Sequence, residues 1–145
     1  MTERGFTLIE ILMVVTVIGL LTAIALPRIG DAMVAQNARA GRDAVISLHA
    51  KARAAAIQRG RSTRLVINGN SMIIVSQHPV TGAVDTVGNV EDLFDRFGVT
   101  LSTTRDTLSF DARGLGTESS ATTVTVTKGA HTYQITISMW GRVSK

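Results

Sequence analysis

The pattern of hydrophobic and polar positions sets the first part of the chain apart from the rest. Residues 6–26 are strongly apolar, and Glu10 is the only charged side chain among them. As an α-helix with a rise of about 1.5 Å per residue, this segment would be about 30 Å long, close to the hydrocarbon thickness of a bilayer. The pattern therefore predicts a membrane-spanning helix, which Pro27 is expected to end or to kink because proline lacks the N–H of a helical residue.

The next stretch predicts an amphipathic helix over residues 31–59. Gly41 is a weak point inside this helix, and Gly60 is a natural stop. The helix is therefore expected to continue from the membrane span and to pack one face on the C-terminal part of the chain. Apolar side chains recur on that face at spacings of three, four and seven residues: Val34, Ala38, Val45, Leu48, Ala52 and Ala55.

From residue 62 onward the pattern is typical of strands and turns. Asn68-Gly69 and Lys128-Gly129-Ala130 are typical hairpin signals. Residues 91–97 fit either a helical turn or a loop, and the order of the strands stays open. The predicted fold class is α+β, with a long N-terminal helix packed on a C-terminal antiparallel β-sheet around one small core. Strands are predicted over residues 63–68, 71–77, 84–90, 99–103, 107–112, 122–127 and 132–138.

Positive charge is concentrated on the second half of the helix. The chain has a net charge of +4, and residues 28–64 contain eight Arg or Lys and two Asp, a net +6. A basic helix suits phosphates, anionic headgroups or the acidic face of a neighbouring subunit. No aromatic residues alternate with these arginines, which argues against a stacking platform for single-stranded nucleic acid.

The sequence predicts no enzyme, cofactor or metal site. It contains no cysteine, so disulfides and thiol chemistry are excluded. His49, His78 and His131 lack ligand spacing and are expected to be surface or half-buried residues. No catalytic constellation or nucleotide-binding loop stands out, and Trp140, the one tryptophan, is expected to be a packing residue.

The N-terminal residues carry a specific resemblance. A carboxylate in a membrane-length segment is costly and therefore predicts a function. The run Gly5-Phe6-Thr7-Leu8-Ile9-Glu10, followed by the apolar span and Pro27, resembles the class III signal of type IV pilins and pseudopilins. This resemblance implies that a prepilin peptidase cleaves between Gly5 and Phe6 on the cytoplasmic side, that Phe6 becomes N-methylated, and that the span is kept.

The resemblance also implies three parts and a mode of assembly. Residues 1–5 are the leader peptide, 6–27 the transmembrane or filament-core helix, and 28–145 the periplasmic pseudopilin domain. Cleavage frees an α-amine at Phe6, and Glu10 of a neighbouring parallel helix can pair with it. The alternative for Glu10 is contact with lipid headgroups. In the family, a proline at the position of Pro27 marks where the helix bends or melts in a filament.

A second resemblance lies near the C-terminus. Leu108-Ser109-Phe110-Asp111-Ala112-Arg113-Gly114 precedes a predicted hairpin, and Ile137-Ser138-Met139-Trp140-Gly141-Arg142-Val143 follows it. Together they are similar to the GspH/FimT subgroup of pseudopilins. The resemblance implies that Phe110 lies in the core, that Gly114 lies in a turn, and that Arg142 lies near the edge of the sheet. Arg142 is there either a solvated charge or a ligand contact.

Two functions stay open. One is a minor pseudopilin of a type II secretion system, held in the inner membrane with its C-terminal domain in the periplasm, whose partners are other pseudopilins, the prepilin peptidase and the secretion machinery. The other is a FimT-like minor pilin of a type IV pilus that primes assembly or binds DNA. Some FimT proteins use a G-R-x-R motif for DNA. Here Arg142 and Lys145 are the possible DNA contacts, but Ser144 replaces the second arginine.

Overall fold

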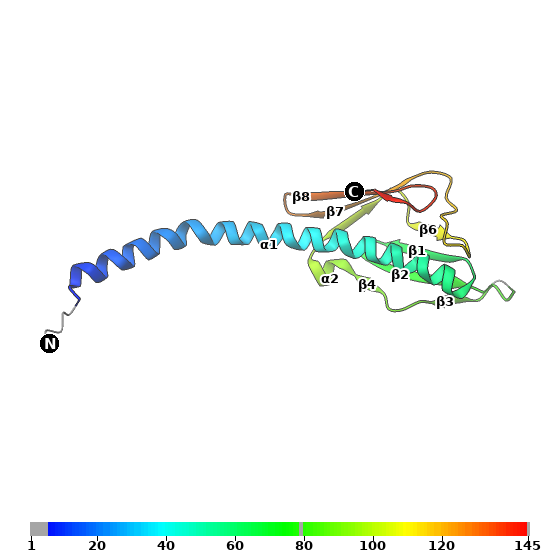
Figure 1. Cartoon of the computed structure of the whole chain (residues 1–145), viewed down its shortest axis with the longest axis horizontal. Coiled ribbons are helices and arrows are strands. Elements are labelled where there is room, and N and C mark those ends of the chain that lie inside the picture. Colours follow the sequence, from blue (N-terminus) through cyan, green and yellow to red (C-terminus); the bar gives the residue numbers. More distant parts are fainter. Residues whose placement is uncertain (1–5, 79, 145) are drawn as a thin grey trace. The chain divides into compact units, whose positions relative to one another are not determined.

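The protein is described here by a computed structural model that covers residues 6–78 and 80–144 (Figure 1). The chain forms two compact units, Met1–Val34 and Ala35–Lys145, and helix α1 contributes to both. The elements in chain order are α1 (Leu8–Arg59), β1 (Thr63–Asn68), β2 (Ser71–Gln77), β3 (Val84–Thr86), β4 (Glu91–Asp92), α2 (Leu93–Phe97), β5 (Thr100–Thr103), β6 (Thr107–Phe110), β7 (Thr122–Lys128), β8 (His131–Ile137) and β9 (Val143–Ser144).

The first unit is an apolar helix without a core of its own. Every side chain that the structure describes between residues 6 and 33 is exposed. The hydroxyls of Thr16 and Thr22 donate to the carbonyls of Leu12 and Ile18 at 2.8 and 2.7 Å, so neither needs water as a partner. By length and composition, α1 could cross a membrane.

Pro27 does not end the helix, contrary to one of the two outcomes expected from the sequence. Helix α1 runs from Leu8 through residue 27 to Arg59. A proline inside a helix removes one backbone hydrogen bond, and the hydrogen bonds of the turns on either side are sufficient here to keep the helix continuous. The predicted end of the helix is confirmed: α1 ends at Arg59, and Gly60 has a φ of 58°.

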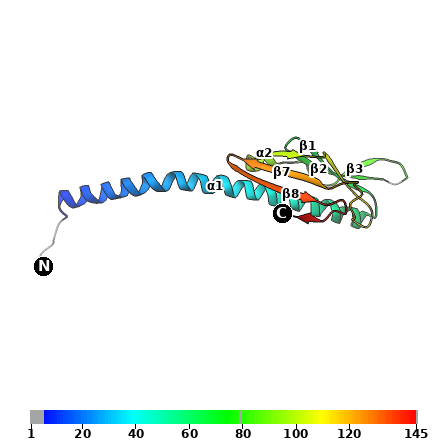
Figure 2. The same cartoon turned by 90° about the horizontal axis from the view of Figure 1, so that it is seen from above.

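The second unit contains two antiparallel sheets, whereas the sequence predicted one. The first sheet has the order β3-β2-β1-β6, with β4 also paired to β2, and the second has the order β5-β7-β8-β9. Strands β5 and β6 are consecutive in the chain but belong to different sheets. Strand β6 pairs with β1, whereas β5 pairs with β7. Both sheets lie along the C-terminal half of α1 (Figure 2).

One hydrophobic core joins this half of the helix to both sheets. The helix contributes the face that the periodicity predicted, and the strands contribute alternate residues, as in the buried–intermediate alternation of β1 and β7. The largest buried side chains are Phe110, Leu65, Met72, Leu93 and Ile135. On the helix the core residues are Val45, Leu48, Ala52 and Ala56.

The local signals were accurate for the hairpins, with a shift of one residue in the first. Asn68, the last residue of β1, pairs with Ser71, the first residue of β2, so the turn consists of Gly69 and Asn70. Gly69 has a φ of 58°, which explains why glycine occupies this position. Strand β3 is shorter than predicted, and β9 was not predicted, because two residues are too few to show alternation.

The segment that stayed open at residues 91–97 is a short strand followed by a helix. Asp92 caps α2 by accepting the N–H groups of Phe94 and Asp95 at 2.8 and 3.1 Å. The hydroxyl of Ser71 donates to the same carboxylate at 2.7 Å and, with these backbone donors, lowers the pKa of Asp92. Gly98 ends the helix in the left-handed conformation.

Gly41 allows the helix to approach the second sheet closely. A β-carbon at residue 41 would lie 2.9 and 3.0 Å from the γ-carbons of Val99 and 3.3 Å from one of Val126. Val99 and Val126 are both fully buried, so neither can move aside cheaply. The residue that weakens the isolated helix is therefore required by its packing.

We predict that Gly41→Ala destabilises the second unit. The alanine gains about 1 kcal/mol of helix propensity, but crowding against two stiff valines costs about 1–3 kcal/mol. We expect urea unfolding of a soluble fragment of residues 29–145 to show a net loss of about 1 kcal/mol. Gly30→Ala is the control, since a β-carbon there meets nothing within 4 Å. A gain of stability in Gly41→Ala would contradict the packing argument.

Candidate functional site

The two C-terminal segments that carry the family resemblance lie against each other in the second unit. Phe110 and Gly116 form an isolated antiparallel bridge, and the Gly116 N–H donates to the Trp140 carbonyl at 3.2 Å. A β-carbon on Gly116 would lie 2.5 Å from the carbonyl oxygen of Met139, and one on Gly141 would lie 3.3 Å from the Phe110 ring. The glycines therefore serve a close approach of two backbone segments.

Asp111 holds the turn between Phe110 and Gly116. Its Oδ1 accepts the N–H groups of Arg113 and Leu115 at 2.9 and 2.8 Å, and its own N–H donates to the Leu115 carbonyl at 2.9 Å. These bonds, the one from Leu115 foremost, lower the pKa of the Asp111 carboxyl. Gly114 has a φ of 75°, which confirms it as a turn residue.

His49 connects helix α1 to this region through a contact with Phe110. Its ring meets Phe110 edge-on with the ring centroids 5.1 Å apart, and its side chain is buried. The prediction of a surface or half-buried residue was therefore wrong for His49. Burial, assisted by the nearby charge of Arg53, lowers the pKa of His49 to about 4, so the imidazole is neutral near pH 7. Its Nε2 is buried without a hydrogen-bond partner.

A groove borders His49 where the helix faces the C-terminal turn, and we call it the Arg53–Arg142 groove. It has a volume of about 390 Å³. Arg142 is exposed in it, and the Arg142 N–H donates to the Ser138 hydroxyl at 3.0 Å. Trp140 is 65% exposed at its mouth, so the sequence prediction of a packing residue was wrong. The lining residues are Ile46, His49, Ala50, Arg53, Trp140, Gly141, Arg142 and Val143.

Sequence reasoning did not connect Arg53 and Trp140 with Arg142. Arg53 was counted only as part of the basic helix, and its partner in the groove lies 89 positions along the chain. One signal was present: His49 and Arg53 are four residues apart and therefore share a helix face. Nothing local indicated which segment would cover that face.

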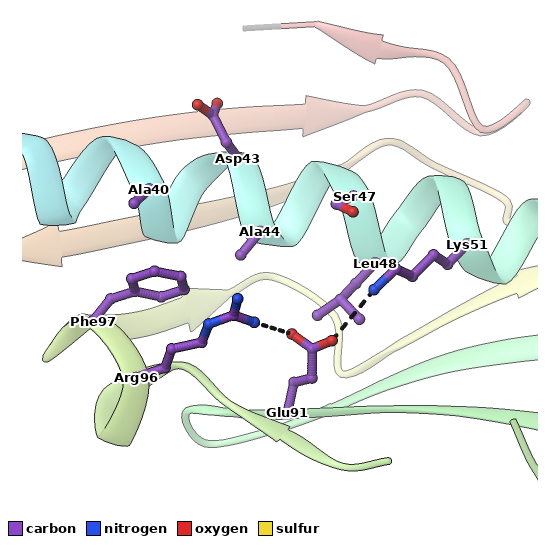
Figure 3. Close-up of a pocket in the computed structure, with 9 residues that line it drawn as sticks. All are labelled: Ala40, Asp43, Ala44, Ser47, Leu48, Lys51, Glu91, Arg96 and Phe97. Atoms are coloured by element: carbon purple, nitrogen blue, oxygen red, sulfur yellow. Dashed lines mark hydrogen bonds and ion pairs between the residues drawn. The ribbon is translucent and has the colours of Figure 1, made fainter. Parts of the chain in front are cut away.

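A second groove lies on another side of the helix, where α1 meets α2, and we call it the Glu91 groove (Figure 3). Its volume is about 380 Å³. Glu91 bridges two cations there, with Oε1 at 3.4 Å from Lys51 Nζ and Oε2 at 3.2 Å from an Arg96 nitrogen. Its charges are thus largely compensated within the chain. The lining residues are Ala40, Asp43, Ala44, Ser47, Leu48, Lys51, Glu91, Arg96 and Phe97.

The first unit holds the residues that the sequence assigned to processing and assembly. Phe6 is 79% exposed and precedes the helix, and Glu10 lies in its first turn. The Glu10 N–H lies 3.3 Å from the Thr7 hydroxyl oxygen, as in a helix cap. An acid in the first turn is favoured by the helix dipole. Gly5 lies outside the described residues.

Of two further predicted residues, the structure describes only the backbone of one and nothing of the other. Pro27 lies within α1, and Lys145 lies outside the residues that the structure describes. Among the described residues, no group of three or more His, Cys, Asp or Glu side chains could hold a metal ion.

Comparisons with known families agree with this arrangement. Residues 43–141 match the family described as Type II transport protein GspH, a range that contains the first signature segment, the second as far as Gly141, and the C-terminal part of α1. The chain belongs to the GspH family. Residues 1–26 match the prokaryotic N-terminal methylation motif. The resemblance inferred from the sequence is thereby confirmed, and this GspH-family member is a pseudopilin or minor pilin in the general sense, a class of structural subunits.

The fold of this GspH-family member is that of a known minor pilin. Two crystal structures of the type IV minor pilin FimU from Pseudomonas aeruginosa superpose with TM-scores of 0.59 and 0.57 at 16% sequence identity. The alignments cover 73% of this chain and 85% and 90% of the FimU chains. No curated protein matches the sequence. The pilin-like fold class is thus confirmed.

We predict that His49 makes the second unit less stable at mildly acid pH. Its pKa is about 4 in the folded protein and about 6.5 when unfolded, so below pH 6.5 the unfolded chain binds the extra proton. The free energy of unfolding should fall by roughly 3 kcal/mol between pH 6.5 and pH 4. Asp92 and Asp111, whose pKa values are lowered, also contribute to the free energy of unfolding, but they lose this contribution only below about pH 4.

The measurement is urea unfolding of the 29–145 fragment as a function of pH. His49→Gln should remove most of the slope between pH 6.5 and pH 4, and His131→Gln is the matched control. An unchanged slope in His49→Gln would show that other groups cause the acid sensitivity.

Proposed function

We propose that this protein is a minor pseudopilin of a type II secretion system. It is a single-pass protein of the bacterial inner membrane, with its N-terminus in the cytoplasm and the domain of residues 28–145 in the periplasm. The prepilin peptidase removes residues 1–5, and the mature subunit joins other pseudopilins in the periplasmic pseudopilus. The GspH-family match over residues 43–141 carries the proposal.

The geometry of the first unit supports this role. An exposed apolar helix of this length is stable only in a bilayer or against other apolar helices. Residues 6–26 offer both possibilities, because their only charge is Glu10 in the first turn. The same helix can therefore leave the membrane and pack in a filament without refolding.

Glu10 supplies the register of assembly. Removal of residues 1–5 places a positive α-amine on Phe6, one helical turn before Glu10. In a bundle of parallel helices, the amine of one subunit pairs with the carboxylate of the next. Two lone charges in an apolar bundle are costly, and the desolvation penalty offsets much of the attraction in the pair. The pair thus specifies alignment more than it adds stability.

A type IV minor pilin that primes pilus assembly or takes up DNA is the second candidate. The likeness to FimU favours it, since the match extends over most of both chains. A deletion strain separates the two candidates. Loss of secreted proteins with intact pili supports the pseudopilin, whereas loss of surface pili or DNA uptake with normal secretion supports the minor pilin.

We predict that Gly5→Ala leaves an uncleaved precursor in the membrane. The added methyl group crowds the backbone where the peptidase must approach the scissile bond. Mass spectrometry of the membrane-extracted wild type should find N-methylated Phe6 as the first residue, and the variant should begin at Met1. Thr2→Ala, which leaves the scissile bond unchanged, should be processed normally. Normal processing of Gly5→Ala would count against the proposal.

We predict that Glu10→Val inserts and is processed normally but is absent from filaments. Its helix is more apolar, so insertion is not impaired, but the Phe6 amine of the neighbouring subunit has no partner. Immunoblots of sheared or crosslinked filaments measure incorporation. Thr16→Val is the control, because that hydroxyl bonds only within its own helix. Incorporation of Glu10→Val at the wild-type level would exclude the pairing.

A further inference from the structure

The Arg53–Arg142 groove has an uncompensated positive charge. Its eight lining residues include two arginines and no carboxylate. Neither guanidinium forms an ion pair with any residue that the structure describes, although six other ion pairs are present in the same part of the chain. The Glu91 groove differs in this respect, because Glu91 lies between Lys51 and Arg96. Two unpaired guanidinium groups favour an anionic ligand.

The other walls of the groove match a ligand that has an apolar part as well as an anionic group. Trp140 is 65% exposed and its neighbour Met139 is 41% exposed, which leaves apolar surface in water at the mouth. Ile46, Ala50 and Val143 add an apolar lining. His49 brings an imidazole whose buried Nε2 lacks a hydrogen-bond partner, an arrangement that costs stability in the free protein. Charged, apolar and polar groups thus surround one volume.

We propose that this groove binds an acidic peptide segment of another pilin-like subunit. A carboxylate of the segment pairs with Arg53 and Arg142, and an apolar side chain beside it packs against Trp140. The volume of about 390 Å³ falls in the range of small ligand sites. Only the identity of the partner as a subunit rests on the proposed function, whereas the chemistry of the ligand rests on the groove.

A nucleic acid fits the groove less well. Binding a single strand requires a series of cations along the backbone and several aromatic surfaces for successive bases. The groove supplies two cations and one indole, and much of its remaining lining is apolar. These walls suit a peptide in which an acidic residue is flanked by apolar residues.

The tryptophan makes the test direct. Trp140 is the only tryptophan of the chain, so fluorescence excited selectively at the indole, to the red of the absorption of Tyr133, reports this side chain alone. The fragment of residues 29–145 is suitable, because every residue of the hydrophobic core lies between residues 38 and 137. The probe is the peptide acetyl-Leu-Glu-Leu-Glu-Leu-amide, and its counterpart with glutamine in place of glutamate is the matched ligand.

We predict a saturable change of Trp140 fluorescence with the glutamate peptide at low salt. Arg53→Gln and Arg142→Gln should each weaken binding about tenfold, as should the change from glutamate to glutamine in the peptide. Arg59→Gln is the control, because Arg59 is an exposed arginine of the same helix that does not line the groove. Urea midpoints of all variants verify that each one is folded.

Three outcomes would overturn the assignment. They are a lack of saturable change, equal binding of the two peptides, and equal weakening by Arg59→Gln and Arg142→Gln. Oligothymidylate is tested in parallel, and tighter binding of it than of the glutamate peptide would make the groove a nucleic-acid contact instead.

The source of the segment is tested in cells with the full chain. A photocrosslinking benzoylphenylalanine replaces Met139, which is exposed beside the groove without lining it. We expect an adduct with another pilin-like subunit that maps to a peptide containing Asp or Glu, and its loss in Arg53→Gln and Arg142→Gln. The absence of an adduct, or an adduct that is insensitive to both variants, would overturn the assignment of the partner as a pilin-like subunit. Processing and filament entry are measured in the same cells, so a failure of the proposed function is recognised separately.

Discussion

The second unit depends on how closely one face of helix α1 approaches two sheets at once. Small or slender side chains such as Ala38, Val45 and Ala52 form this face, and Gly41 lies where the approach to Val99 is closest. Because a single core joins the helix to both sheets, neither sheet has an independent interior. The helix that anchors the protein is therefore also the centre of its folded domain.

The same packing explains where the grooves lie and why they differ. Wherever a helix rests on sheets, its flanks meet the loops that leave the strands, and each flank takes its charge from those loops. On one flank, Glu91 at the start of α2 compensates Lys51. On the other flank, the turn before β9 brings Arg142 to Arg53. The two grooves are therefore similar in volume, but the charges of the Glu91 groove are compensated and those of the Arg53–Arg142 groove are not.

The C-terminal signature residues divide into those that shape the backbone and those that face solvent. Phe110 and Gly141 are buried and meet the half-buried Gly116, where glycines permit contacts that a side chain would block. The role of Phe110 and the turn at Gly114 could be predicted from the sequence, because they follow from the resemblance. The exposure of Trp140 and the burial of His49 could not, because burial depends on which distant segment covers a residue.

The sequence by itself determined the apolar helix with its lone acid, the amphipathic continuation to Arg59, and most of the strands, since periodicity and turn residues act over a few positions. The tertiary structure alone decided that there are two sheets and that Arg53 and Arg142 share a groove. The physical reason is that strand pairing and packing join residues many positions apart, and the most favourable arrangement of the whole chain selects those partners.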